Sequence, residues 1–313
     1  MDQSGIHAVT GAFGFSGRYI AKRLIEVGRS VITLTGSPER PNPFGDKLKV
    51  YPFNFDNPAA LAQSLKGVRV LYNTYWVRFN YKTFTHARAV ENSLTLFKAA
   101  HEAGVERIVH ISITNPSKDS PIEYFRCKAQ LEEAVKEIFP SYAILRPALI
   151  FGPDDTLINN IAWNLRRFPV FPLFGRGNYR IQPIFVDDLA AVAVSEGQRH
   201  YNVTLDCIGP ESPTYREFIK QIASAIGKKR LICPAPKLLA YLGTRMIGKV
   251  LGDIIITRDE LKALTDELLH VDAQPVGTTK LSEWLNRNAY SIGRSYHSEL
   301  KKRRRKHGPF ATR

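Results

Sequence analysis

Three glycines near the start of the chain constrain its fold more than any other feature. They are Gly11, Gly14 and Gly17, each three residues from the next. They follow a β-type apolar run, Ile6–Thr10, and open a helical pattern, Ser16–Val27. A strand that turns tightly into a helix needs glycine where the backbone approaches a diphosphate, and the helix N-terminus then attracts that anion. The spacing predicts a dinucleotide-binding turn, against the alternative of a glycine turn that binds nothing.

The first 150 residues alternate short β-rich runs with helical patterns, which predicts a parallel sheet with crossover helices. We expect strands at Ile6–Thr10, Ser30–Thr35, Leu48–Phe53, Val68–Asn73, Arg107–Ile113 and Tyr142–Leu145. We expect helices at Ser16–Val27, Asn57–Leu65, 84–103 and Tyr124–Ile138. The predicted fold class is therefore α/β: a Rossmann-type doubly wound parallel sheet with a smaller, mainly helical C-terminal lobe on the substrate side.

The chain returns to the sheet after residue 150. Glycine and proline become frequent there, and the segments Ile184–Val186, Asp187–Val194 and Tyr201–Asp206 read as a strand end, a helix and a late strand of the same sheet. We therefore expect an NAD(P)-binding domain made of 1–150 plus about 178–208. A substrate-side lobe would comprise about 151–177 plus 209–300, and 301–313 would form a basic tail.

The excess of positive charge is concentrated at the end of the chain. The formal net charge is +15, and removing the seven cations at 301–306 and 313 leaves +8. We expect Ser291–Leu300 to continue as a helix into this run. The run either remains solvated without a partner or meets an anionic membrane surface. Nucleic acid would be contacted only non-specifically, because no nucleic-acid motif is recognised.

Several classes of protein are excluded or disfavoured by composition. No apolar stretch approaches the roughly 18 residues that span a bilayer, and no signal peptide is visible. Three cysteines form neither a disulfide framework nor a metal clip, and the eight histidines lack metal-ligand spacing. We expect a cytoplasmic protein without a metal, or one bound peripherally at the inner face of a membrane.

The end of the second predicted strand favours NADP(H) over NAD(H). An NAD site usually places an acid there, but no acid occurs before Glu39. Thr35 and Ser37 could donate to a 2′-phosphate and Arg40 could pair with its charge. The alternative is that Arg40 lies in a solvated loop and either cofactor binds. Asn54 and Phe55, after the third strand, are placed to meet the adenine.

Tyr124 and Lys128 are four residues apart and so share one face of a predicted helix. A phenol titrates too high for acid–base chemistry at neutral pH, and a nearby ammonium lowers its pKa. The same lysine can hold a ribose hydroxyl. The pair gains meaning from its position downstream of the dinucleotide turn.

These residues resemble the short-chain dehydrogenase/reductase superfamily, in its extended and atypical branches. The motifs are TGAFGFSG at 10–17, YFRCK at 124–128, LRPALIFGP at 145–153 and IFVDDLA at 184–190. The segment 157–175 is similar to the family that contains the NADPH-binding accessory subunit of respiratory complex I and its bacterial epimerase-like relatives.

The resemblance implies a role for particular residues. Tyr124 would be the acid–base and Lys128 its partner, with Thr114 completing the set by register and Ser112 as second choice. The cofactor would contact Gly11, Phe13, Gly14, Phe15 and Gly17 at its diphosphate, Asn54 at adenine, Asn73 and Thr74 at a ribose, and Pro147–Ile150 at the nicotinamide carboxamide.

Two functions remain open from the sequence. One is an NADP(H)-dependent oxidoreductase or epimerase acting on a small molecule in a cleft between the two lobes. The other is a non-catalytic NADP(H)-binding protein used in assembly, as the resemblance to the complex I subunit implies. The intact Tyr124 and Lys128 favour the first. The short loop before Tyr124 and the basic tail favour the second.

Overall fold

A computed structural model describes residues 5–301. The described residues fold into two compact units, one formed by 5–147 and Val186–Asp206 and the other by Ala148–Phe185 and 207–301. The expected boundaries at 150 and 178 differ from these. The reason is that β7 (Leu149–Phe151) pairs in parallel with β9 (Pro183–Phe185) in a small sheet, so both segments belong to the second unit.

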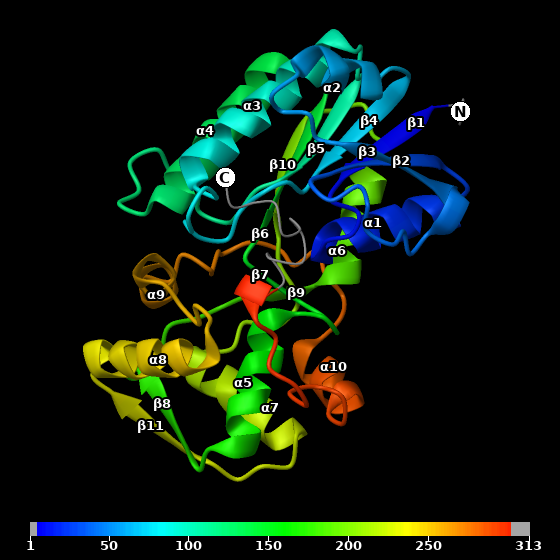
Figure 1. The fold of residues 1–313 in the computed structure, drawn as a ribbon. Coiled ribbons are helices and arrows are strands. Elements are labelled where there is room, and N and C mark those ends of the chain that lie inside the picture. The colour runs from blue at the N-terminus through cyan, green and yellow to red at the C-terminus, as the bar shows by residue number, and fades with distance from the viewer. Residues whose placement is uncertain (1–4, 302–313) are drawn as a thin grey trace. The chain divides into compact units, whose positions relative to one another are not determined.

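The first unit contains a seven-stranded sheet in the order β10-β6-β5-β4-β1-β2-β3, shown in Figure 1. The strands that follow one another in the sheet as β6, β5, β4, β1, β2 and β3 all pair in parallel. The strands are β1 (Ile6–Thr10), β2 (Ser30–Thr35), β3 (Leu48–Pro52), β4 (Val68–Asn73), β5 (Arg107–Ile111), β6 (Tyr142–Pro147) and β10 (Val203–Cys207). The strand order reverses between β1 and β4, and ligands of such sheets bind beyond the carboxyl ends at this point. The predicted doubly wound fold is confirmed.

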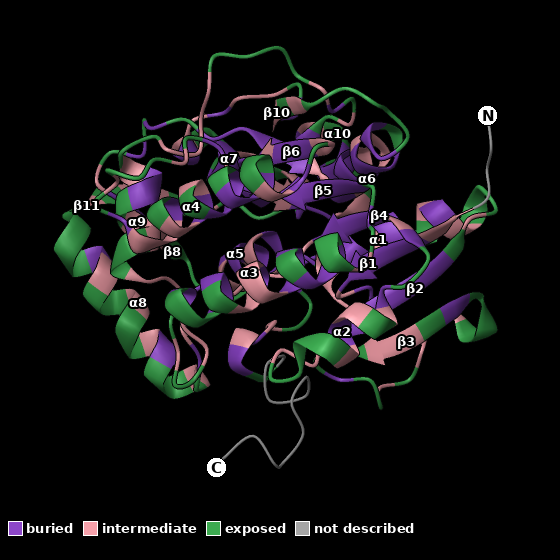
Figure 2. Cartoon of the chain, turned by 90° about the horizontal axis from the view of Figure 1, so that it is seen from above, coloured by how far each residue is buried: buried purple, intermediate pink, exposed green. Residues whose placement is uncertain are grey.

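Helices cover both faces of this sheet. The helices are α1 (Phe15–Glu26), α2 (Pro58–Ser64), α3 (His86–Glu102), α4 (Glu123–Ile138) and α6 (Val186–Glu196). Helix α1 packs on α6, and the guanidinium of Arg23 makes a bidentate ion pair with the carboxylate of Asp187, at 2.7 and 2.9 Å. Apolar residues of α2, α3 and α4 form a second layer with the strands. Figure 2 shows the strands between these layers as largely buried.

The predicted cap residue and the proline after it explain where α2 begins. The Asn57 side chain accepts a hydrogen bond from the Ala60 N–H at 3.1 Å, and Pro58 occupies the first helical position of α2. Both features satisfy or remove amide groups that a helix start would otherwise leave unpaired.

The second unit is built around its own apolar core. Its elements besides β7 and β9 are α5 (Thr156–Arg167), β8 (Val170–Phe174), α7 (Tyr215–Ala225), β11 (Leu231–Ala235), α8 (Lys237–Leu251), α9 (Arg258–Thr265) and α10 (Leu281–Asn288). The first unit also contains a short 3-10 helix, η1 (Gly45–Lys47). The core includes the fully buried rings of Phe151 and Phe218 and the nearly buried Trp284. Strands β8 and β11 pair in parallel at its edge.

The expected helix over Ser291–Leu300 is wrong. The chain turns through 289–295, and helix resumes only at 299–301. Gly293 adopts φ +69° and lies so close to α5 that a Cβ would approach the Ala162 carbonyl carbon to 2.5 Å. Asn159 accepts the Gly293 N–H and Asn160 accepts the His297 N–H, at 3.1 and 2.8 Å. These contacts hold a turn that helical periodicity does not reveal. The rest of the basic run, from 302 onward, lies outside the described residues.

Within residues 5–301 no helix is long and apolar enough to cross a membrane. Among the same residues, no three His, Cys, Asp or Glu side chains lie close enough together to hold a metal ion.

Candidate functional site

The glycine turn between β1 and α1 has the geometry that a diphosphate needs. Gly11 has φ +67°, and its N–H donates to the Leu34 carbonyl at 2.8 Å. The Gly14 N–H donates to the Gly11 carbonyl at 2.7 Å. A Cβ on Gly17 would lie 2.8 Å from the Gly11 carbonyl carbon, which is closer than real contacts allow. Glycine is therefore required both for the turn and for the approach of the helix.

The N-terminus of α1 is open to an anion. Gly14 is the N-cap and provides no side-chain cap, and no acid lies in the first turn. The first amides of the helix and its dipole consequently face the turn without a competing carboxylate. The flanking Phe13 and Phe15 are half-buried. The Ala12 N–H donates to the Thr33 hydroxyl at 3.1 Å, which fixes the turn to β2.

A polar network joins the carboxyl ends of β1, β4 and β5. The Thr10 hydroxyl accepts the Thr74 N–H at 2.7 Å and contacts the Asn73 side-chain oxygen at 3.1 Å. The Thr74 hydroxyl donates to the Thr10 carbonyl at 2.6 Å. Asn73 also contacts Nδ1 of His110 at 3.0 Å, and burial holds the His110 pKa well below its usual value. Asn73 and Thr74 therefore lie at the strand-order reversal, where the resemblance expects a ribose.

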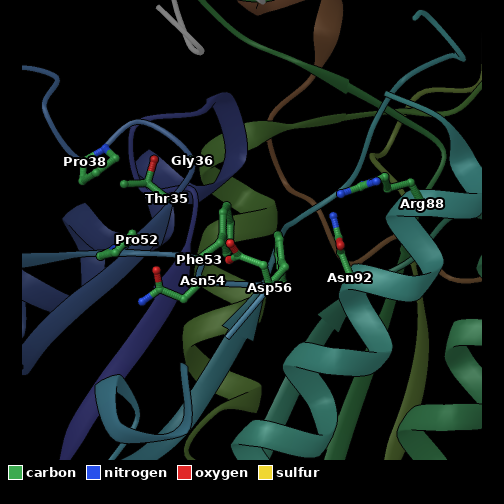
Figure 3. A pocket seen from close by; sticks show the side chains of 10 residues that line it. Thr35, Gly36, Pro38, Pro52, Phe53, Asn54, Asp56, Arg88 and Asn92 are labelled. Carbon is green, nitrogen blue, oxygen red and sulfur yellow. The ribbon is translucent and has the colours of Figure 1, made fainter. Parts of the chain in front are cut away.

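A cavity of about 370 Å³ opens beside the ends of β2 and β3. Figure 3 shows its lining, which comprises Thr35, Gly36, Pro38, Pro52, Phe53, Asn54, Phe55, Asp56, Arg88 and Asn92. Its volume is at the lower end of the range for small-ligand sites. Three predicted cofactor residues, Thr35, Asn54 and Phe55, are brought together here. Asn54 adopts φ 45°, a left-handed conformation that asparagine tolerates better than most residues.

Aromatic rings form one side of this region. The Phe53 and Phe55 rings stack with centroids 4.7 Å apart, and Tyr75 lies 5.0 and 5.1 Å from them. The Asn92 side-chain amide donates to the Tyr75 hydroxyl at 2.8 Å, and burial raises the Tyr75 pKa. The result is an apolar wall with amide groups at its edge, which suits a flat heterocycle.

Only one of the three residues that were expected to bind a 2′-phosphate lines the cavity. Thr35 lines it, whereas Ser37 and Arg40 are not among its lining residues. The Ser37 N–H donates to the Thr35 hydroxyl at 3.2 Å, and the Arg40 N–H donates to the Ser37 carbonyl at 3.3 Å, so this segment is a turn. The cationic side chain at the cavity is instead Arg88, from α3. Sequence reasoning did not single out Arg88.

Tyr124 lies in the first turn of α4 against two aromatic side chains. Its ring meets Trp76 edge-on at 5.6 Å and His86 edge-on at 5.5 Å, and those two rings stack at 5.7 Å with an angle of 3°. Nε2 of His86 and the indole nitrogen of Trp76 are buried without a hydrogen-bond partner among the described residues, and Nδ1 of His86 lies 3.5 Å from Oε2 of Glu123. Neither Trp76 nor His86 was predicted as a site residue, because neither lies in a recognised motif.

Lys128 is held beneath this aromatic group. Its side chain is 2% exposed, and Nζ donates to the Ile111 carbonyl at 2.8 Å. The ammonium also lies 4.5 Å from the centre of the Trp76 ring. Burial lowers the Lys128 pKa to about 7, although Glu132 acts in the opposite direction. An ammonium of this kind is close to its titration point at neutral pH.

The hydroxyl candidates before α4 occupy different environments. Thr114 is buried, and its N–H donates to the Pro147 carbonyl at 3.1 Å. The Ser112 hydroxyl donates to buried Glu132 at 2.5 Å. Glu132 also receives both guanidinium contacts of Arg146, at 2.9 and 2.5 Å. Ser112 is thus part of a buried ionic network, which the sequence did not suggest. Pro147 ends β6, whereas Ile150 belongs to β7 in the second unit.

Solved structures share the fold of the chain. A triphenylmethane reductase from Citrobacter sp., complexed with NADP(H), aligns with TM-score 0.75 and 19% identity over 90% of this chain and 99% of that one. An NADPH-dependent quinone oxidoreductase from Escherichia coli aligns with TM-score 0.72 and 18% identity over 90% and 98%. Likeness at this identity establishes the Rossmann-like fold.

Sequence relatives extend across both units. Subunit 9 of the NADH dehydrogenase 1 alpha subcomplex from Arabidopsis thaliana is 29% identical over 86% of this chain and 72% of its own length. A ceramide reductase from Caulobacter vibrioides is 30% identical over 76% of each chain. A family model described as the NAD dependent epimerase/dehydratase family matches residues 7–203. The chain belongs to this family.

Proposed function

We propose that this protein is an NADP(H)-dependent oxidoreductase that reduces a carbonyl or a comparable unsaturated small molecule, with Tyr124 as the acid–base group. The observation that carries the proposal is the position of Tyr124, which lies one helical turn before the buried Lys128 on α4 and meets edge-on the Trp76 ring that lies 4.5 Å from Nζ of Lys128. A lysine beside a tyrosine can assist proton transfer by the phenol.

The residues of the first unit fit the cofactor. Gly11, Gly14 and the N-terminus of α1 would hold the diphosphate, and the cavity with Phe55 and Arg88 would hold the adenosine end. NADP(H) would supply the hydride when bound. The glycine turn supports this assignment independently of the cavity, because a Cβ at Gly17 would clash with the backbone that approaches the anion.

Tyr124 and Lys128 would manage the proton. While Lys128 carries its charge, it would favour the phenolate of Tyr124 one turn away, and with a pKa of about 7 it carries that charge mainly below neutral pH. The edge-on rings of Trp76 and His86 limit water around the phenol. The phenol would donate its proton to the oxygen of the reduced substrate, and solvent would restore it.

A second function is favoured by one specific feature. Lys128 is 2% exposed and covered by the Trp76 ring, a position that stabilises the fold without reaching a ribose. A protein in which the nucleotide serves assembly would need no accessible lysine. A relative that is named as a subunit of NADH dehydrogenase supports this alternative.

The test compares the unsubstituted protein with Tyr124→Phe. NADPH oxidation would be followed with a quinone, the substrate class in the name of one solved neighbour, and with a panel of ketones and aldehydes. Turnover should fall by about 10²–10⁴, while NADPH affinity stays within about twofold. Tyr290→Phe, at an exposed tyrosine of the second unit, should leave both unchanged. Full turnover in Tyr124→Phe would reject the assigned role, and NADPH binding without turnover of any carbonyl would favour assembly.

A further inference from the structure

The amine of Lys128 is covered by the ring of Trp76. Nζ donates to the Ile111 carbonyl at 2.8 Å, and the centre of the Trp76 ring lies 4.5 Å from Nζ. Lys128 is buried, so its amine does not face solvent. A hydroxyl that bonds to this amine must come within about 3 Å of Nζ. A ligand therefore reaches the amine only after the ring has moved.

The other parts of the dinucleotide site are not covered in this way. The glycine turn faces the N-terminus of α1, where no side chain caps the helix and no acid competes for the first amides. The cavity beside the ends of β2 and β3 has a volume of about 370 Å³. The residues of the first unit thus fit the diphosphate and the adenosine of NADP(H). The nicotinamide end, in contrast, would meet an amine that an aromatic ring of the chain already occupies.

Two buried nitrogen atoms indicate that the ring can leave this position. Trp76 stacks on His86, with ring centres 5.7 Å apart. The indole nitrogen of Trp76 and Nε2 of His86 are both buried, and neither has a hydrogen-bond partner among the described residues. A buried polar atom without a partner is costly, and native structures contain few of them. Rotation of the indole would let its N–H meet water or a bound ligand.

The backbone around Trp76 is anchored, which restricts how the ring can move. The Thr74 N–H donates to the Thr10 hydroxyl at 2.7 Å. On the other side, the His86 N–H donates to the Asn80 side-chain oxygen at 2.6 Å. Because these contacts fix the chain before and after Trp76, we expect a rotation of its side chain between rotamers and not the opening of a whole loop.

We propose that Trp76 controls access to Lys128: its ring competes with the nicotinamide ribose for the amine and turns away when the nicotinamide end of NADP(H) binds. This inference rests on the proposed function, because it requires the chain to bind NADP(H). The cavity and the glycine turn would first hold the adenosine and the diphosphate. Trp76 would then leave one side of the amine to a ribose hydroxyl, while the His86 ring stays against Tyr124.

Covering the amine should weaken the binding of NADP(H) by a measurable factor. The contact of an ammonium with a tryptophan ring favours the covered state by roughly threefold when exposed and by roughly thirtyfold when desolvated. The chain must give up this contact before the nicotinamide end binds, so the apparent affinity falls by the same factor. Removing the ring should therefore strengthen the binding of NADP(H), but not of a ligand that lacks the nicotinamide end.

The experiment is calorimetric titration of the unsubstituted protein, Trp76→Phe and Trp76→Ala with two ligands. One ligand is NADP⁺, and the other is adenosine 2′,5′-bisphosphate, which lacks the nicotinamide end. The titrations are made at about pH 6.5, below the Lys128 pKa of about 7, so that the amine carries its charge. Trp76→Ala should bind NADP⁺ about threefold to thirtyfold more tightly than the unsubstituted protein, and Trp76→Phe should lie between them. All three proteins should bind the bisphosphate equally.

Tryptophan emission provides a second measurement that does not depend on affinity. When NADP⁺ binds, Trp76 should exchange its packed position for a more solvated one, and its emission should shift to longer wavelength. The difference between the spectra of the unsubstituted protein and Trp76→Phe separates this emission from that of Trp163 and Trp284. NADP⁺ is used because NADPH absorbs tryptophan emission. The bisphosphate should cause no shift.

Two further variants serve as controls. Trp163, on α5, also lies beside a cation, with the guanidinium carbon of Arg167 4.3 Å from its ring centre. Trp163→Ala makes the same chemical change outside the glycine turn and the cavity, so it should leave the affinities for both ligands unchanged. In a Lys128→Met background, Trp76→Ala should no longer strengthen NADP⁺ binding, because the amine for which the ring competes is gone.

The outcomes separate this inference from the proposed function. A Trp76→Ala protein that binds NADP⁺ no more tightly than the unsubstituted protein would overturn this inference alone. Equal strengthening for NADP⁺ and the bisphosphate would do the same, as would unchanged Trp76 emission when NADP⁺ binds. Trp76→Phe retains an aromatic ring and gives the same comparison if Trp76→Ala is unstable. Failure of the unsubstituted protein to bind NADP⁺ would overturn the proposed function as well.

Discussion

Lys128→Met should change how stability depends on pH. Lys128 is buried, and its pKa lies at about 7 instead of its usual 10.5. The unfolded chain therefore binds more protons than the folded chain between these values, and the free energy of unfolding rises with pH there. The cost of the buried charge is fully present below pH 7 and is relieved as the lysine loses its proton. Methionine fills a similar unbranched volume without a charge.

The magnitude follows from the two pKa values. Each unit of difference corresponds to about 1.4 kcal/mol, so the unsubstituted protein should gain roughly 2 kcal/mol relative to Lys128→Met between pH 7 and pH 9. Urea unfolding at each pH measures this difference, and other titrating groups cancel in it. Lys136→Met, at an exposed lysine of the same helix, should show no such trend. A difference between Lys128→Met and the unsubstituted protein that stays constant from pH 7 to 9 would refute the reasoning.

Two further predictions concern the cofactor region. Arg88→Ala should lower the preference for NADPH over NADH by about tenfold, because it removes the cation at the cavity, whereas Arg40→Ala should change it less than twofold. Calorimetric titration with NADPH and NADH measures the preference of each variant. A larger loss of preference in Arg40→Ala than in Arg88→Ala would indicate that the 2′-phosphate binds at the Ser37–Arg40 turn instead. Gly17→Ala places a methyl group 2.8 Å from the Gly11 carbonyl carbon, so it should destabilise the fold by about 1–3 kcal/mol and weaken both nucleotides together. Gly243→Ala has no atom within 4 Å and is the control; equal stability of the two variants would contradict the clash.

Local features of the sequence predict most of the first unit. Strand β1 and the glycine turn were predictable because a short apolar run and a glycine at positive φ are properties of adjacent residues. The same holds for α2, whose cap at Asn57 depends on a contact three residues away. Expected strand and helix ends differ by only a few residues from the observed ones.

The missed residues depend on contacts between distant segments. Arg88 and Asn92, from the first turns of α3, line the cavity beside the residues that follow β3, and Asn92 also donates to Tyr75 after β4. A helical pattern in the sequence does not say which end of a helix approaches a site. Trp76 and His86 become relevant only when the loop after β4 brings them to Tyr124. The false helix after α10 has the same origin, since Asn159 and Asn160 hold residues 293 and 297 from far along the chain.

The pairing of α1 with α6 has a consequence for the order in which the protein is made. Residues 148–185, which belong to the second unit, are synthesised between these two helices. Until α6 leaves the ribosome, α1 lacks the partner that covers it and that forms the ion pair between Arg23 and Asp187. Edge strand β10 follows later still. The nascent first unit therefore carries an uncovered helix face and an open sheet edge for the time needed to translate about sixty more residues, which is the interval in which a chaperone would have most to protect.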